Sequence, residues 1–299
     1  MLRMTQQGRE PLIYVALVIL LALPFAADLL FPLGTAVWDG YFPPVVCAYL
    51  APRPLAPLIV AAMATLLTIV GFTLAPAGVD PHVAIINRSI GCVTTFILAF
   101  TGYGLIRSRL AVQHQDWLQA GQVGLAHALG GEQPLDELGN SALKFLSGYL
   151  GAQAGVLFIR NGDGFRRYAS FGVPAKAPVP ACVVPGDGLL GQAIADHRSF
   201  VVDSVPDDYL YYGSALGQAK PKTMLIATAE ADGVVNAVIE LGLQHGEHRN
   251  ALELLTRVGG QLGVAIRSGK YRARLRELLE ETQQQAEELQ AQSEELRAN

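Results

Sequence analysis

One short string in this chain has a spacing that is known from nucleotide chemistry. Pro185–Gly191 reads PGDGLLG and therefore contains G-x-G-x-x-G. In dinucleotide-binding proteins such glycines let the backbone approach a pyrophosphate, provided that a strand leads into them and that a helix and a parallel strand follow. Here a proline-rich loop, VPAKAPVPAC, leads in. We therefore expect the glycines to turn the chain into a short helix, Leu189–Asp196, without binding NAD.

The other residue types that serve catalysis or metal binding are scattered. Cys47 and Cys92 fall in apolar segments and Cys182 in a more polar half, so no disulfide framework is expected. The sequence contains no P-loop and no cluster of zinc ligands. It therefore predicts neither catalytic residues nor a metal site, and it leaves any cofactor unknown.

The distribution of charge divides the chain into three parts. Only 16% of the residues are charged, against about 25% in an average globular domain. Residues 1–106 hold eight charged side chains, whereas the segment from Lys270 onward holds twelve. The first part is expected to lie in lipid and the middle to be soluble, and the last is a highly charged tail.

Uncharged runs predict four transmembrane helices, since about 20 residues are needed to cross the hydrocarbon of a bilayer. The weakest candidate contains Asp39 and two prolines. The four runs are Pro11–Ala27, Leu33–Leu50, Pro54–Val79 and Ser89–Ile106.

The arginines of this part indicate its orientation. With four crossings, the arginines that flank the helices all fall on one side, and the opposite loops contain none, which predicts that both chain termini are cytoplasmic. These are Arg3, Arg9, Arg53, Arg107 and Arg109.

Three charged residues, Asp28, Asp39 and Arg88, would lie near the outer ends of these helices. Charges in a bilayer are expensive and are usually paired. Two interpretations stay open: three interfacial residues that touch lipid headgroups, or a paired polar cluster that packs the bundle or receives a ligand.

The middle part shows helical spacing, then strand pairs around tight turns, then a long helix. This order predicts an α+β domain with an antiparallel sheet flanked by helices. The segments are a helix at Glu137–Gly151, strands at Ala154–Arg160, 165–172, Thr223–Glu230 and Val234–Leu243, and a helix at Glu247–Ile266.

Two strings in this part, PGDGLLGQAIADHRSFVVDSVPDDYL and MLIATAEADGVVNAVIELGL, resemble GAF domains, which are small regulatory sensor folds. The apolar strings LIVAAMATLLTIVGFTLAP and NRSIGCVTTFILAFTGY resemble the four-span N-terminal region of bacterial membrane histidine kinases. The resemblance implies a multi-pass protein of the bacterial inner membrane.

The resemblance does not name a ligand. The residues of cyclic-nucleotide GAF domains are not recognisable, and Cys182 has no neighbouring His, as a covalently held bilin would require. Either ordinary packing or a ligand pocket accounts for the candidate wall residues. These are Asp203, Tyr209, Tyr211, Tyr212 and Met224.

The tail contains a heptad seam, because seven positions alternate spacings of four and three. The seam predicts a parallel two-stranded coiled coil, with a single solvated helix as the alternative. Its members are Leu275, Leu279, Thr282, Ala286, Leu289, Ser293 and Leu296.

Together these features predict a multi-domain chain: an all-α membrane region, an α+β GAF domain and a C-terminal coiled coil. The expected divisions are a cytoplasmic N-terminus at 1–10, spans at 11–106, a connecting helix at 107–121, the GAF domain at 122–268 and the signalling helix at 269–299.

The predicted function is the sensory input module of a two-component histidine kinase. None of the six histidines is followed by the acidic residue and proline of a phosphoacceptor box, so these residues are not expected to be an enzyme. The expected partners are the bilayer, a second copy of the chain, a small molecule, and a kinase core or response regulator, but no nucleic acid. The alternative is a stand-alone membrane scaffold that recruits a partner through its coiled coil. A transporter is disfavoured because the spans show no internal repeat.

Overall fold

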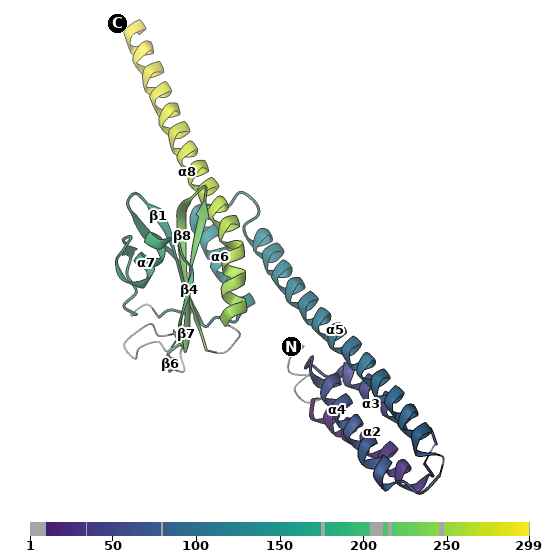
Figure 1. The fold of residues 1–299 in the computed structure, drawn as a ribbon. Helices are drawn as coiled ribbons and strands as arrows, with labels where there is room; N and C mark the ends of the chain where they lie inside the picture. Colours follow the sequence, from purple (N-terminus) through teal and green to yellow (C-terminus); the bar gives the residue numbers. More distant parts are fainter. Residues whose placement is uncertain are drawn as a thin grey trace. The chain divides into compact units, whose positions relative to one another are not determined.

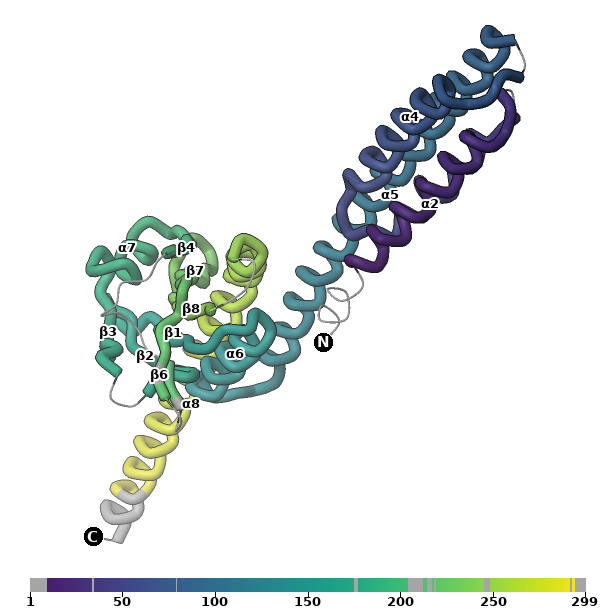
Figure 2. Tube along the Cα trace, turned by 90° about the horizontal axis from the view of Figure 1, so that it is seen from below, coloured from purple at the N-terminus to yellow at the C-terminus, as the bar shows by residue number. Residues whose placement is uncertain are grey.

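The structure, a computed structural model, describes residues 10–33, 35–78, 80–174, 177–203, 212–214, 217–244 and 248–298. The chain divides into two compact units, Met1–Asp116 and Trp117–Asn299. Figures 1 and 2 show the elements of each unit.

The first unit is a helical bundle built from α2 (Glu10–Leu30), α4 (Ala56–Leu74) and the first part of α5 (Pro81–Ala128). Within the described residues, these three helices are long and apolar enough to cross a membrane. Their packing surfaces are rich in small residues, and large aliphatic side chains face outward. Such a distribution is typical of helices that pack in lipid. Ala61, Ala64 and Ala99 are buried, whereas Leu12, Ile59 and Ile97 are more than half exposed.

The predicted second span, Leu33–Leu50, is a broken segment instead of one regular helix. It consists of η1 (Val37–Tyr41), the short helix α3 (Phe42–Cys47) and η2 (Ala48–Leu50). Pro43 and Pro44 lie at the start of α3, where their missing N–H groups prevent η1 and α3 from forming one continuous helix. The segment nevertheless runs along α5. A Cβ on Gly91 would lie 2.4 Å from the Trp38 ring, and one on Gly102 would lie 2.1 Å from the Tyr49 ring.

The second unit contains a six-stranded sheet with the order β3-β2-β1-β8-β7-β4, and every pairing in it is antiparallel. A separate two-stranded ribbon pairs β5 with β6. The strands are β1 (Ala154–Asn161), β2 (Gly164–Phe171), β3 (Cys182–Val183), β4 (Phe200–Asp203), β5 (Tyr212–Ser214), β6 (Gly217–Ala219), β7 (Thr223–Ala231) and β8 (Val234–Leu243).

Helices cover both faces of the six-stranded sheet (Figure 1). One face packs against α6 (Leu135–Leu150), the beginning of α8 (His248–Ala298) and the last turns of α5. The other face packs against α7 (Gly188–Asp196) and the segment around β3. This architecture agrees with the predicted helix-flanked antiparallel sheet.

The helices α5 and α8 each run without interruption through predicted domain divisions. The predicted divisions at 106/107 and 121/122 fall inside α5, and the division at 268/269 falls inside α8. No glycine or proline interrupts α8 after Gly269, so the core helix continues directly into the tail.

The PGDGLLG string forms a turn and a helix start. Gly186 and Gly188 have φ values of 85° and 63°, which glycine adopts without strain. The Gly186 N–H donates to the Gly191 carbonyl at 2.8 Å. A Cβ on Gly191 would lie 2.4 Å from the Val184 carbonyl oxygen. Because β3 pairs antiparallel with β2, the string lacks the parallel-sheet context of a dinucleotide fingerprint.

Candidate functional site

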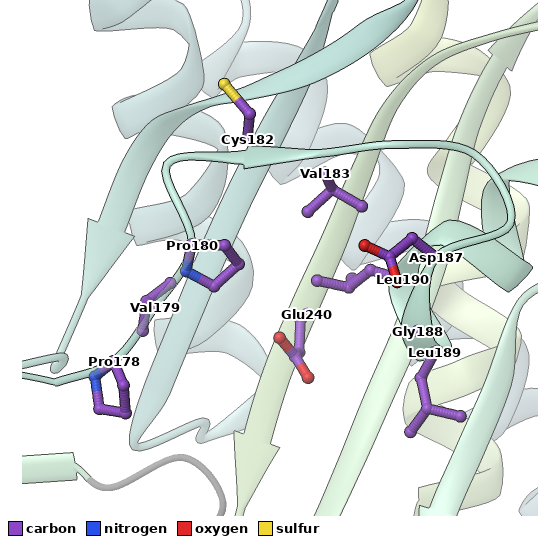
Figure 3. Close-up of a pocket in the computed structure, with 10 residues that line it drawn as sticks. All are labelled: Pro178, Val179, Pro180, Cys182, Val183, Asp187, Gly188, Leu189, Leu190 and Glu240. Carbon is purple, nitrogen blue, oxygen red and sulfur yellow. The ribbon is translucent and has the colours of Figure 1, made fainter.

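A cavity of about 350 Å³ lies on the α7 face of the sheet. Its wall is mainly apolar and comes from the proline-rich segment before β3 and from the first turn of α7 (Figure 3). The volume is within the usual range for small-molecule pockets. The lining residues are Pro178, Val179, Pro180, Cys182, Val183, Asp187, Gly188, Leu189, Leu190 and Glu240.

Glu240 supplies a carboxylate to the base of this cavity. It lies in the middle of β8, opposite Val156 of β1 and Ile226 of β7. The residue is only 6% exposed, and its Oε1 has no hydrogen-bond partner among the described residues. Burial disfavours the charged form and raises the pKa of Glu240 from 4.5 to about 7. Figure 3 shows the carboxylate directed between Val179 and Leu189, while the Cys182 thiol points away.

Sequence reasoning missed Glu240. Its signal was present, because it is the one ionisable residue within the apolar string VVNAVIELGL. The alternation of the strand would have placed it on the same face as Val238, which packs against α7. What the sequence did not show was that this face has a cavity above it.

The five predicted wall residues lie in different places. Met224 is fully buried. It pairs with Gly242 in the register that pairs Ile226 with Glu240, so it lies on the face that carries Glu240.

The other predicted wall residues are not placed in this cavity. Asp203 is exposed and pairs with Thr223 at the end of β4. It is one position out of phase with Val202, which packs on the α7 face. Tyr212 is half-buried in β5. Tyr209 and Tyr211 lie outside the described residues.

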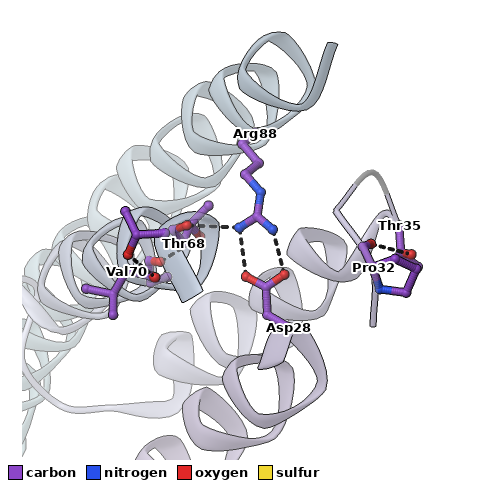
Figure 4. A network of polar contacts seen from close by, with 8 residues as sticks. Asp28, Pro32, Thr35, Thr68, Val70 and Arg88 are labelled. Atoms are coloured by element: carbon purple, nitrogen blue, oxygen red, sulfur yellow. Dashed lines mark hydrogen bonds and ion pairs between the residues drawn. The ribbon is translucent and has the colours of Figure 1, made fainter. Parts of the chain in front are cut away.

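In the helical bundle, Arg88 of α5 pairs with Asp28 of α2 (Figure 4). The Arg88 Nη1 donates to Asp28 Oδ2 at 2.7 Å, and its Nη2 donates to Asp28 Oδ1 at 2.6 Å. Nη1 also donates to the Thr68 carbonyl of α4 at 2.9 Å. The two charged residues are 8% and 3% exposed. One guanidinium therefore connects three helices. Its bidentate ion pair with the carboxylate is the strongest geometry for such a contact.

Two neighbouring residues of α4, Gly71 and Phe72, accommodate this ion pair. A Cβ on Gly71 would lie 2.0 Å from Asp28 Oδ2, so glycine is what lets the carboxylate approach α4. The Arg88 guanidinium also lies 5.8 Å from the centre of the Phe72 ring, within the range of a cation–π contact. Asp39, the other candidate partner, is exposed in η1.

Polar contacts attach the turns of the sheet to α8 where this helix leaves the domain. The Lys270 ammonium donates to the Arg160 carbonyl at 2.8 Å, next to the β1–β2 turn. Arg267 pairs with Asp232 in the β7–β8 turn, where Asp232 has a φ of 52°. Both hairpins of the sheet therefore contact the same stretch of α8.

Beyond these contacts, α8 exposes apolar side chains. Leu275 and Leu279 are both 59% exposed, and Leu289 is 67% exposed. The seam members Thr282, Ala286 and Ser293 are also exposed, and the side chain of Leu296 lies outside the described part. The structure adds Tyr271 and Leu278, exposed at 66% and 45%, to this surface.

Among the described residues, no group of three or more His, Cys, Asp or Glu side chains is arranged to hold a metal ion. The three cysteines are free, and Cys182 is exposed.

Comparison with known proteins identifies the fold of the second unit. The family model for the GAF domain matches residues 132–267. No curated protein matches the chain.

Three solved structures illustrate the similarity. The GAF domain of nlh2 from A. aeolicus, in an inactive state, is 18% identical with a TM-score of 0.42, over 52% of this chain and 98% of that one. Free methionine-R-sulfoxide reductase from Neisseria meningitidis, in complex with its substrate, is 15% identical with a TM-score of 0.42, over 54% and 93%. The GAF domain described for a sensor histidine kinase from Pseudomonas syringae pv. tomato is 12% identical with a TM-score of 0.39, over 57% and 97%.

The family match covers the region in which two helices and α7 enclose a six-stranded antiparallel sheet. Residues 132–267 of this chain form a GAF domain.

Proposed function

We propose that the chain is the sensory input module of a two-component histidine kinase. In this proposal the helical bundle anchors the protein in the bacterial inner membrane, and the GAF domain responds to a small molecule. The helix α8 then passes the response, as one strand of a dimeric rod, to a kinase core outside these 299 residues.

The observation that carries this proposal is the continuity of α8. Its first turns lie in the core of the domain, where Leu254, Leu262 and Ile266 are buried. The same helix then exposes Leu275, Leu279 and Leu289 at heptad spacing. Apolar residues that recur in this way on an exposed helix are stabilised when a second helix covers them. A change in the sheet would reach the rod through the hairpin contacts at Arg267 and Lys270.

The membrane anchor rests on the three apolar helices and on the broken segment η1–α3–η2, which we propose as the fourth crossing. It runs beside α5 from Gly91 to Gly102, a rise of about 16 Å at 1.5 Å per residue. A short crossing of this kind is tolerated in lipid because its neighbours bury it: Val45 and Ala48 are fully buried. Four crossings with the arginines on one side place both termini in the cytoplasm.

The alternative is a membrane-anchored GAF scaffold that recruits a partner through the same tail. The two proposals differ in whether the rotational phase of α8 matters. A kinase core attached to a rigid rod requires a fixed phase, whereas a recruitment surface does not.

A chimera separates these alternatives. Residues 1–299 are joined to the phosphoacceptor and ATP-binding core of a soluble histidine kinase, with zero to seven residues of helical sequence inserted at the junction. Autophosphorylation is measured in membranes. The proposal predicts activity that recurs with a period of seven inserted residues, because a heptad restores the phase. A control series with a flexible Gly/Ser spacer before the insertions should show no period.

Activity that does not depend on insertion length in the helical series would contradict the proposed relay of the signal through α8 to the kinase core. It would favour the scaffold.

A further inference from the structure

We propose that the cavity above Glu240 binds a small organic cation, with the cationic group on the Glu240 carboxylate and an apolar ring or chain against the proline-rich wall. The inference rests on the proposed function of the GAF domain as the sensory part, and it assigns the chemical class of the ligand.

The Oε1 atom of Glu240 lacks a hydrogen-bond partner among the described residues. Glu240 faces Val156 and Ile226 across the two neighbouring strands, and neither side chain can donate a hydrogen bond. The wall segment contributes Pro178 and Pro180, whose backbone nitrogens carry no proton. A buried carboxylate without a donor is costly, so a ligand that brings its own donors gains from filling this site.

The charges of the lining favour a cationic ligand. Among the described residues of the lining, Glu240 and Asp187 supply carboxyl groups, Cys182 supplies a thiol, and none is a lysine, arginine or histidine. An anionic ligand would therefore meet a like charge, whereas a cation would replace the missing partner of Glu240. Asp187 is exposed at the N-cap of α7, which leaves Glu240 as the anchor within the cavity.

The shape and polarity of the wall restrict the rest of the ligand. Val179, Val183 and Leu190 surround the carboxylate with apolar atoms, and Figure 3 shows the carboxylate directed into this space. A ligand with one charged end and one apolar end fits such a wall. A cavity of about 350 Å³ is large enough for one substituted ring. The burial that raises the pKa of Glu240 to about 7 also means that a cation would displace a proton near neutral pH.

The test uses three isosteric probes of different charge: benzamidine, benzamide and benzoate. Binding to the full chain in lipid nanodiscs is measured by calorimetry at pH 7. The proposal predicts that benzamidine binds at least about 10-fold more tightly than either of the others. In Glu240→Gln this preference should fall below about 3-fold. Asp187→Asn, the matched control, should retain it.

A second readout is the proton balance. Calorimetry in two buffers of different ionisation enthalpy should show proton release when benzamidine binds the wild type, and none in Glu240→Gln. If Glu240→Gln does not fold, Leu189→Trp serves instead, since it fills the cavity while leaving the carboxylate in place and should abolish binding of all three probes.

Equal affinity for the three probes, absence of saturable benzamidine binding, or loss of the preference only in Asp187→Asn would overturn the proposal. Crosslinking of the α8 tail in the same nanodiscs distinguishes failure of the cation site from failure of the relay. Probe selectivity without tail crosslinks refutes the relay alone, and tail crosslinks without selectivity refute the cation site alone.

Discussion

Arg88 and Asp28 are almost completely buried, and each supplies the hydrogen bonds that the other needs. Glu240 is buried to a similar degree, yet its Oε1 lacks a partner among the described residues. A satisfied ion pair holds helices together, whereas an unsatisfied carboxylate is free to meet a ligand. The two sites therefore differ in their expected response to mutation.

Removing Arg88 should destabilise the bundle by about 3–5 kcal/mol, because Asp28 is left as an uncompensated buried charge. Arg88→Ala combined with Asp28→Ala should lose less than Arg88→Ala alone. Unfolding of the full chain in bicelles measures both. The control is Arg88→Ala with Asp39→Ala, which should show no rescue because Asp39 is exposed. Rescue by Asp39→Ala and not by Asp28→Ala would contradict the observed pairing.

Glu240 should make the GAF domain less stable as the pH rises. Its pKa is about 7 when folded against 4.5 when unfolded, so the folded state binds the proton more tightly. The resulting stability is complete below pH 4.5 and is lost as the pH rises through 7, with a total of about 3 kcal/mol. Glu240→Gln should remove this loss. In a Trp38→Phe background the fluorescence of Trp117, which stacks on Tyr149, reports the unfolding.

A wild-type stability that changes over this pH range no more than that of Glu240→Gln would show that the carboxylate is satisfied in the folded protein.

The sequence left the partner of Arg88 undecided and did not predict Glu240. It named Arg88 and two acids, but the choice between Asp28 and Asp39 depended on helix phase and on Gly71, which no periodicity reveals. Glu240 was not predicted because the loop that encloses it, around Val179, has no regular pattern from which its position could be inferred.

At the scale of elements, the sheet, its hairpins and the helices around it were predictable, whereas the bounds of the long helices were not. Alternating apolar residues and tight turns such as Asp232-Gly233 specify β7 and β8 locally. The sequence also indicates that the last membrane helix continues past Arg109, because no strong breaker lies before Gly121, but the end of such a helix has no local signal. The broken segment around Pro43 shows the opposite case, in which an apolar run long enough for a span contains prolines that prevent a regular helix.

The exposed surface of the tail allows two closely related seams. The predicted seam uses Leu279. Tyr271 and Leu278, which are exposed but do not belong to that seam, fit a second seam with the same period. The two seams share Leu275, Thr282 and Leu289. The two seams differ by a rotation of about one seventh of a turn. The polar members Thr282 and Ser293 leave neither packing strongly favoured.

Replacing Thr282, Ala286 and Ser293 by Leu should stabilise the predicted seam and fix the output of the attached kinase core, because apolar residues at seam positions strengthen a coiled coil. Autophosphorylation of the chimera, with and without a ligand, is the measurement. The matched control changes Gln283, Gln284 and Gln290 to Leu off the seam. A triple seam variant that responds to ligand like the wild type would argue against signalling through this packing.

Inserting four residues between Gln283 and Gln284 should invert or abolish the output, since an interrupted heptad rotates the downstream segment relative to the upstream one. An insertion of seven residues at the same point is the control and should preserve the output. Equal output from both insertions would mean that the phase of the rod carries no information.

At the scale of the whole molecule, the proposed topology has both termini in the cytoplasm. Reporter fusions after Arg109 should show cytoplasmic activity, and fusions within 76–83 should show periplasmic activity, because the flanking arginines resist translocation. The substitution Arg53→Glu should weaken the preference for this orientation. Periplasmic activity at the Arg109 junction would contradict four crossings and leave the three regular helices as the only spans.

In the proposed relay, α8 forms a parallel two-stranded rod in the membrane-bound protein. Single cysteines at 275, 279, 282, 286, 289, 293 and 296, in a chain lacking Cys47, Cys92 and Cys182, test it directly by oxidative crosslinking in native membranes. A parallel rod should give strong crosslinks at these positions and weak ones at 277, 281 and 288. An added cysteine at 278 distinguishes the two seams. Uniformly low crosslinking in membranes that contain the folded protein would mean that the tail is a solitary solvated helix, and would contradict the relay.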